Sequence, residues 1–415
     1  MSRPRENPLN WKNIPFDPAR LPLATLLKLA AAFCAIVGLY DVAAITSMLA
    51  GGPDLGPPKW VLFPDFLVFN AASRAFLEGH LVTIYDLDAF HRFENAIYAD
   101  RFPSYVGFRP YLYPPQWVLL TLPLALVPVG VAYGLFMGGT AALATALAGL
   151  RDKWGWLAVM TSPGAFWTMV SGQNSFLSVG LFYGGLRLVE RHPIGAGVAL
   201  GALSYKPQLW AMVPVALLVA RQWRALASTL ATAALLALFS FLIFGVDVWR
   251  AFFELARFAS SPHFTETMFG VVGDYMTTVL AGARIAGLPT VPAQILHGIV
   301  AVAAVAAVVH ACRRAPWNDV QIAVIAAASL LISPYLINYD MLLVMPAAVA
   351  LFRQRARSGF LPGEPFFYAA LWLAPNIGMR FNQHHLPLSA VLIVLFLGLA
   401  WLTARPPAKS ALVRA

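Results

Sequence analysis

The sequence predicts an all-α protein that crosses a lipid bilayer about ten to thirteen times. Hydrophobic residues make up 59% of the 415 positions and charged residues only 12%, about half their share in an ordinary soluble domain. Apolar stretches close to the roughly 20 residues that span a bilayer core recur along the chain. These stretches are rich in leucine and alanine and lack the alternation of membrane β-strands, so a transmembrane barrel is excluded.

Each expected helix corresponds to one apolar stretch between polar or helix-breaking residues. The first stretch follows about 20 polar residues and is too long for a signal-peptide core, so we expect it to remain as a membrane helix. Residues 113–150 are interrupted at Pro128, and residues 193–220 are interrupted at Lys206 and Pro207. The expected helices cover residues 22–49, 113–150, 154–171, 174–190, 193–220, 225–245, 291–311, 318–333, 339–352, 363–377 and 385–404.

The distribution of charge predicts the topology. Most of the basic residues behind the net charge of +10 lie in short segments between apolar stretches, whereas the long connections 51–112 and 246–290 hold more than half of the acidic residues. Because basic loops stay in the cytoplasm, we expect residues 1–21 and 405–415 on the cytoplasmic face and both long connections on the periplasmic face. Residues 1–415 would then form a single transmembrane domain of the cell inner membrane, and the excess charge does not indicate nucleic acid as a partner.

The first long connection carries two predicted short helices. Residues 65–79 place apolar side chains on one face and polar side chains four positions apart on another, which predicts an amphipathic helix lying along the membrane surface. A second helix, over residues 87–99, would be capped by Asp86. Together they would form a lid over the bilayer.

Asp65 stands at the start of the first of these helices and has two interpretations. A carboxylate near a membrane-embedded cavity can accept a proton from a sugar hydroxyl, a step worth about 10²- to 10⁴-fold in rate. Aspartate is also a favoured N-cap residue and suits the positive end of a helix dipole. Position alone does not separate a general base from a cap.

Lys206 and Arg109 are the basic candidates for binding a phosphate. Lys206 lies within an apolar run, where a cation at the centre of a membrane helix costs about 2.5 to 3.5 kcal/mol on insertion scales. It would either meet a donor phosphate or extend to an interface beside the break at Pro207. If it binds the phosphate, Lys206→Met should weaken donor affinity while leaving the fold intact, and unchanged affinity would indicate the interface role. Arg109 would contact a phosphate or lipid headgroups.

Four further polar residues are candidates for substrate binding. Gln173 and Asn174 would hydrogen-bond sugar hydroxyls or simply turn the chain between two helices. Tyr339 and Asp340 begin an expected helix at the outer face, where Asp340 would bind substrate or favour the helix N-terminus. No metal site is expected, because the one adjacent histidine pair, at 384–385, has no third ligand spaced to join it.

A series of short motifs resembles glycosyltransferase family 87, a member of the GT-C superfamily of polyprenyl-phosphate-sugar-dependent enzymes that includes mycobacterial α-(1→2)-mannosyltransferases. The similarity spans about residues 60–350, and its specificity lies in the order and spacing of the motifs. These are F-P-D-F at 63–66, A-x-x-A-F-L-E-G-H at 72–80, I-Y-D at 84–86, Y-P-P-Q at 113–116, G-Q-N-S at 172–175, Y-K-P-Q at 205–208, R-Q-W-R at 221–224 and S-P-Y-L-I-N-Y-D at 333–340.

The resemblance implies a multi-pass membrane enzyme whose first outer loop carries the catalytic aspartate, here Asp65. It also implies transfer of a hexose, with mannose the family's best-known case, from a polyprenyl-phosphate donor to a hydroxyl of a glycolipid or glycan acceptor, with inversion and without a cofactor or an essential metal. The mannosyltransferases carry a His-His pair after their Ser-Pro where this chain has Asn338, Tyr339 and Asp340, so the sugar and the acceptor stay open.

Two alternatives belong to other classes of protein. A membrane transporter or lipid flippase would also contain broken helices and an embedded cation, but the long connection after the first helix has no counterpart in the second half of the chain. A membrane scaffold without chemistry would not explain Asp65, Lys206 and Asp340 together. The sequence therefore favours the glycosyltransferase.

Overall fold

The computed structural model describes residues 63–98, 109–150, 152–314 and 317–404, together with the single positions 32, 36 and 39. Over this part of the chain it consists of α-helices and short 3-10 helices, with one isolated β-bridge between Met276 and Ile337. The predicted all-α class is confirmed. The expected first helix, 22–49, lies outside the described residues apart from those three positions.

The described elements fall into an N-terminal and a C-terminal series. The first series is α2 (Pro64–Leu77), η3 (Leu81–Tyr85), α3 (Leu87–Tyr98), α4 (Gln116–Thr121), η4 (Leu122–Leu126), α5 (Val129–Leu147), α6 (Lys153–Met160), α7 (Pro163–Ser171), α8 (Ser175–Leu188), α9 (Pro193–Ala202), η5 (Leu203–Tyr205), α10 (Pro207–Trp210), α11 (Met212–Val219) and α12 (Trp223–Ala259). The second is α13 (Pro262–Val272), η6 (Gly273–Tyr275), α14 (Val279–Ile285), α15 (Thr290–Arg314), α16 (Asp319–Leu331), η7 (Asn338–Val344), α17 (Met345–Ser358), α18 (Glu364–Gln383) and α19 (Leu388–Thr403).

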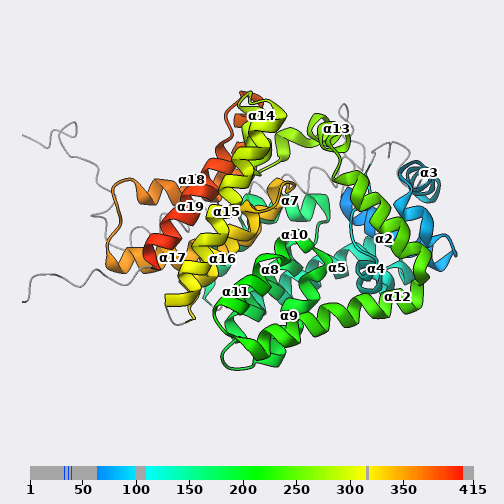
Figure 1. Ribbon diagram of the computed structural model, residues 1–415, viewed down its shortest axis with the longest axis horizontal. Coiled ribbons are helices and arrows are strands. Elements are labelled where there is room, and N and C mark those ends of the chain that lie inside the picture. The colour runs from blue at the N-terminus through cyan, green and yellow to red at the C-terminus, as the bar shows by residue number, and fades with distance from the viewer. Residues whose placement is uncertain are drawn as a thin grey trace, which may run out of the picture.

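The two series pack against each other, since α7 and α11 of the first series contact α18 and α16 of the second. Figure 1 shows the arrangement. Helices α15 to α19 stand together on the left of this view, α2 to α5 lie on the right, and α12 runs along the lower edge. Helix α16 is the centre of the C-terminal group, because every side chain from Val320 to Leu331 is buried and it packs against α15, α17 and α19. The loop that leads from α16 to η7 therefore starts from a fixed position.

Three described helices are long and apolar enough to cross a membrane: Val129–Leu147, Trp223–Ala259 and Thr290–Arg313. Their outward faces carry large apolar side chains, such as Leu242 on α12 and Val302 on α15, which are 67% and 71% exposed. Apolar surface of this kind is stable in contact with lipid and costly in contact with water. Five shorter apolar helical segments accompany them, and the total of ten to thirteen crossings stays a prediction.

Proline residues mark the boundaries of several helices. The expected breaks at Pro128 and at Lys206–Pro207 are present, since α5 begins directly after Pro128 and α10 begins at Pro207. The single helix expected over 154–171 is wrong. It is divided into α6 and α7 at Pro163, which cannot donate a backbone hydrogen bond, and the Ser162 hydroxyl caps the new N-terminus by accepting from the Ala165 amide.

Helix α2 is packed inside the protein over most of its length, whereas the helix expected over residues 65–79 had one face open to its surroundings. Nearly all of its side chains before Phe76 are buried, including the polar Asn70 and Ser73. The Asn70 side chain donates to a backbone carbonyl of η4 and accepts from a tyrosine hydroxyl, and Ser73 pairs with Thr121 at 2.9 Å. The polar side chains in the middle of the helix are thus satisfied by buried partners, while Glu78 at its end is exposed.

The described parts of the two long connections contain further helices. The Asp86 carboxylate accepts from the amides of Asp88 and Ala89 at 3.1 and 2.9 Å, which confirms the predicted cap of α3. Helix α12 continues past residue 245 into the second connection, and Gly245 provides the kink with φ 83° and ψ 174°, a conformation open to glycine. Residues 99–108 of the first connection lie outside the described chain.

Candidate active site

The site is built around the close approach of two turns that lie far apart in the sequence. Phe63 precedes α2 with a left-handed φ of 47°, and its amide donates to the Val170 carbonyl of α7 at 2.7 Å. Gly172 ends α7 with φ 70°, and a Cβ at this position would lie 2.5 Å from Cβ of Phe66. Position 172 therefore requires glycine both for its positive φ and for its close contact with Phe66. This contact places the turn between α7 and α8 against the first turn of α2.

Asp65 is the second residue of α2, and its carboxylate does not cap the helix. One oxygen accepts from Nη1 of Arg109 at 3.2 Å and the other from Nε2 of Gln173 at 3.1 Å. The side chain of Asp65 is 17% exposed and that of Arg109 is 42% exposed, so the carboxylate is accessible at the edge of the site. The interpretation of Asp65 as an N-cap is wrong, because Pro64 already lies inside the helix.

Gln173 is the centre of the polar network. Its Nε2 donates to Asp65 and to the hydroxyl of Tyr339, each at 3.1 Å. Its Oε1 accepts from the Tyr113 hydroxyl and from the backbone amide of Asn174, each at 2.9 Å. Both donors and the acceptor oxygen of the amide are engaged, so the orientation of the Gln173 side chain is fixed.

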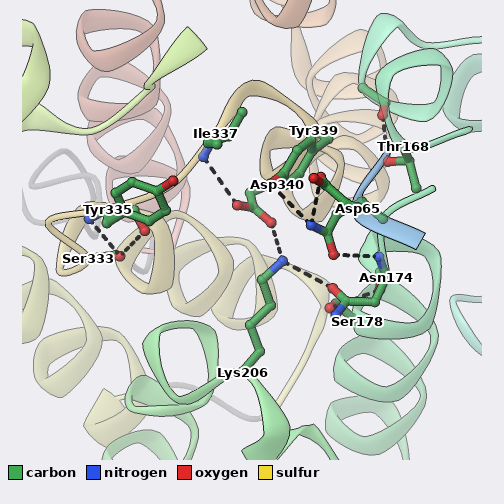
Figure 2. Close-up of polar contacts among 12 residues, drawn as sticks. Asp65, Thr168, Asn174, Ser178, Lys206, Ser333, Tyr335, Ile337, Tyr339 and Asp340 are labelled. Carbon is green, nitrogen blue, oxygen red and sulfur yellow. Dashed lines mark hydrogen bonds and ion pairs between the residues drawn. The ribbon is translucent and has the colours of Figure 1, made fainter. Parts of the chain in front are cut away.

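Lys206 and Asp340 form a buried ion pair next to this network (Figure 2). Their side chains are 2% and 4% exposed, and Nζ of Lys206 lies 2.5 Å from one oxygen of Asp340. The same Nζ donates to Oδ1 of Asn174 at 3.2 Å, and the other oxygen of Asp340 accepts from the Ile337 amide at 3.3 Å. Lys206 therefore does not extend to an interface. An apolar replacement would leave Asp340 charged and unpaired, contrary to the expectation for Lys206→Met.

The electrostatic environment favours the protonated form of Asp65 more than water does. Burial raises the pKa of its carboxyl above the ordinary value of 3.8. The positive charge of Arg109, the hydrogen bond from Gln173 and the charge of Lys206 act in the opposite direction, while Asp340 adds to the rise. A carboxylate with a raised pKa is a better proton acceptor than a free aspartate.

The structure brings all seven candidate residues from the sequence into one continuous network. Arg109, Asp65, Gln173 and Tyr339 form one chain of contacts, which continues through Asn174 to Lys206 and Asp340. They come from α2, the segment before α4, the turn between α7 and α8, the break before α10, and η7. Their roles in substrate binding and catalysis stay predictions.

Two tyrosines at the site were not singled out from the sequence. Tyr113 fixes the Gln173 amide through its hydroxyl. Burial, followed by the charges of Asp65 and Asp340, raises the pKa of the Tyr335 hydroxyl. Both belong to motifs that carry the family resemblance, Y-P-P-Q and S-P-Y-L-I-N-Y-D. Their place in these motifs was the sequence evidence that could have identified them as site residues.

Within the described ranges no group of three or more histidine, cysteine, aspartate or glutamate side chains is arranged to hold a metal ion. The network instead offers two carboxylates, a lysine, an arginine and several hydroxyl and amide groups. Such groups can bind sugar hydroxyls and a phosphate, and one partly exposed carboxylate can accept a proton. The fold and the site define a membrane protein with a polar, partly buried site.

Comparison with known proteins identifies the family. The model of glycosyltransferase family 87 matches residues 111–334, more than half of the chain. The chain belongs to glycosyltransferase family 87 and is a membrane glycosyltransferase. No curated protein and no solved structure matched the chain.

The matched range contains part of the site. Gln173, Asn174 and Lys206 lie inside it, whereas Asp65 and Asp340 lie beyond its two ends. Membership of the family favours the enzyme over the transporter or lipid flippase that the sequence left as an alternative.

Proposed function

We propose that the protein transfers a hexose from a polyprenyl-phosphate donor to a hydroxyl of a glycolipid or glycan acceptor, with inversion at the anomeric carbon. The observation that carries this proposal is the Asp65 carboxylate, which is held between Arg109 and Gln173, remains 17% exposed, and has a raised pKa. A positioned base of this kind and a leaving phosphate are the two requirements of a direct displacement. Mannose is the sugar best known in the family.

In the proposed step Asp65 accepts the proton of the acceptor hydroxyl while the hydroxyl oxygen attacks the anomeric carbon of the donor. The new carbon–oxygen bond forms as the bond from that carbon to the phosphate oxygen breaks, and polyprenyl phosphate leaves with the bonding electron pair. Since attack and departure occur on opposite faces of the sugar, the configuration inverts. Nε2 of Gln173 keeps the Asp65 carboxylate in place and also donates to the Tyr339 hydroxyl.

Arg109 is the basic residue best placed to meet the donor phosphate. Its side chain is 42% exposed and touches Asp65 at 3.2 Å, so a phosphate bound by it would lie beside the base. Lys206 would contact the phosphate only by loosening its pair with Asp340, although its charge still acts across the site. Gln173 and Asn174 would bind sugar hydroxyls, with membrane lipids surrounding the helices.

The proposed location is the cell inner membrane, with several crossings and an active site that faces the periplasm. The support is the charge distribution, because the segments that carry Asp65 and Arg109 belong to the acidic connection 51–112. A lipid-linked donor would reach such a site from within the bilayer.

The proposal is tested with purified protein in lipid vesicles. Radiolabelled polyprenyl-phosphate hexoses, including mannose, are supplied in parallel with the corresponding nucleotide sugars and a membrane lipid extract as acceptor. We expect label in the lipid fraction with at least one polyprenyl-phosphate hexose and none with the nucleotide sugars, and a product of inverted anomeric configuration. Transfer from nucleotide sugars alone would contradict the proposed donor. An Arg109→Gln variant should show a raised KM for the donor with a smaller change in kcat.

A further inference from the structure

A cavity lies outside the Asp65 network, at another part of the molecule. Its volume is 880 Å³, and it is formed between the turn that joins α11 to α12 and the end of α15. Apolar residues of α11 and Cys312 line one part, and Arg221, Trp223 and Arg313 line the rest. The spanning segment Thr290–Arg313 is about 36 Å long, so the cavity is separated by one bilayer thickness from the start of α15 beside α14.

The cavity is cationic. Two guanidinium groups line it, and among the residues that the structure describes no carboxylate does. Across the described parts of the chain, neither Arg221 nor Arg313 takes part in an ion pair. Trp223 is 58% exposed beside them, a placement typical of the boundary between lipid tails and headgroups.

The backbone holds Arg221 in a conformation that favours glycine. The Gln222 amide donates to the Leu217 carbonyl at 2.9 Å and the Arg221 amide to Leu218 at 3.1 Å, a turn that commonly ends a helix with glycine in the left-handed region. Arg221 occupies that position with φ 56°. Arg221 thus occupies a strained backbone position, and it lines the cavity.

We propose that this cavity binds the phosphate-bearing headgroup of an anionic phospholipid. Guanidinium groups pair with phosphate oxygens in a bidentate geometry, and basic pockets between membrane helices bind anionic headgroups. The exposed apolar face of α15 lies next to the cavity and would accompany the acyl chains. This site shares no residue with the Asp65 network, so it does not depend on the proposed transfer reaction.

The test compares lipid binding by three variants in detergent, using native mass spectrometry and the thermal midpoint. Phosphatidylglycerol is the anionic probe, phosphatidylcholine the neutral control, and inorganic phosphate tests for a free anion. We expect wild-type protein to bind phosphatidylglycerol more tightly than phosphatidylcholine, and Arg221→Gly and Arg313→Gln each to weaken phosphatidylglycerol binding about fivefold. Arg224→Gln is the matched control, because Arg224 is exposed on the same turn of chain but does not line the cavity.

The Arg221→Gly variant separates binding from folding. Glycine relieves the left-handed strain, so this variant without lipid should be at least as thermally stable as wild type. Unchanged phosphatidylglycerol affinity in Arg221→Gly and Arg313→Gln would overturn the site, as would an equal loss in Arg224→Gln. Stabilisation by inorganic phosphate equal to that by phosphatidylglycerol would overturn the assignment to a lipid.

Discussion

Replacing Lys206 by methionine is expected to destabilise the protein strongly. The lysine and its partner Asp340 are 2% and 4% exposed, so the variant would leave a carboxylate buried without a counter-charge. The remaining hydrogen bond, from the Ile337 amide, is 3.3 Å long and does not neutralise it. Breaking a buried pair in this way costs about 3 to 5 kcal/mol, which is a large fraction of the about 5 to 15 kcal/mol that stabilises an ordinary domain.

A double-mutant cycle distinguishes this loss from a loss of packing. The single variants Lys206→Met and Asp340→Asn each leave one buried charge unpaired, whereas the double variant leaves none. We therefore expect each single variant to be less stable than the double variant, with a coupling free energy of at least about 2 kcal/mol. The free energy of unfolding is measured by titrating sodium dodecyl sulfate into mixed micelles and following tryptophan fluorescence.

Two results would refute the reasoning about this pair. The first is a Lys206→Met variant that loses less than about 1 kcal/mol, since no buried charge would then have been left unpaired. The second is a cycle that is additive within about 0.5 kcal/mol, the behaviour of residues that do not interact.

Three further predictions concern the base, a helix cap and helix packing. Because the pKa of Asp65 is raised above 3.8 and only its ionised form accepts a proton, kcat/KM should fall as the pH is lowered through that raised pKa; a profile that stays flat down to pH 4 would contradict this. Asp86→Ala should cost about 0.5 to 2 kcal/mol in unfolding experiments and Asp86→Asn much less, since the amide oxygen still caps α3; equal losses would count against the cap. Gly201→Ala should lower the thermal midpoint, because its Cβ would lie 2.5 Å from Cβ of Thr232, whereas Gly138→Ala, where the space is open, should not.

The parts of the fold that depend on local signals were predictable from the sequence. Apolar composition was sufficient for the all-α membrane class, and proline located the breaks after Pro128 and at Pro207. The cap at Asp86 followed from the preference of aspartate for that position. The burial of α2 did not follow, because its periodicity is the same whether the polar face meets water or buried partners such as Thr121.

The candidate site was predictable as a set of residues but not as an arrangement. Polar residues in apolar surroundings stand out singly, which is why Lys206 and Asp340 were both identified. Their pairing joins positions 134 apart, and the bond from Gln173 to Asp65 joins positions 108 apart. Contacts at such separations depend on tertiary packing, here on the approach that Gly172 allows, and local patterns do not contain that information.

The measurement that tests the central claim most directly compares Asp65→Asn with Glu78→Gln in the polyprenyl-phosphate transfer assay. Both variants convert a carboxylate to an amide near α2, but Glu78 is exposed at the far end of this helix. If Asp65 is the base, Asp65→Asn should lower the transfer rate by about 10²- to 10⁴-fold while donor binding and the thermal midpoint stay close to wild type, and Glu78→Gln should remain active. An Asp65→Asn enzyme that transfers sugar at the wild-type rate would contradict the role of Asp65.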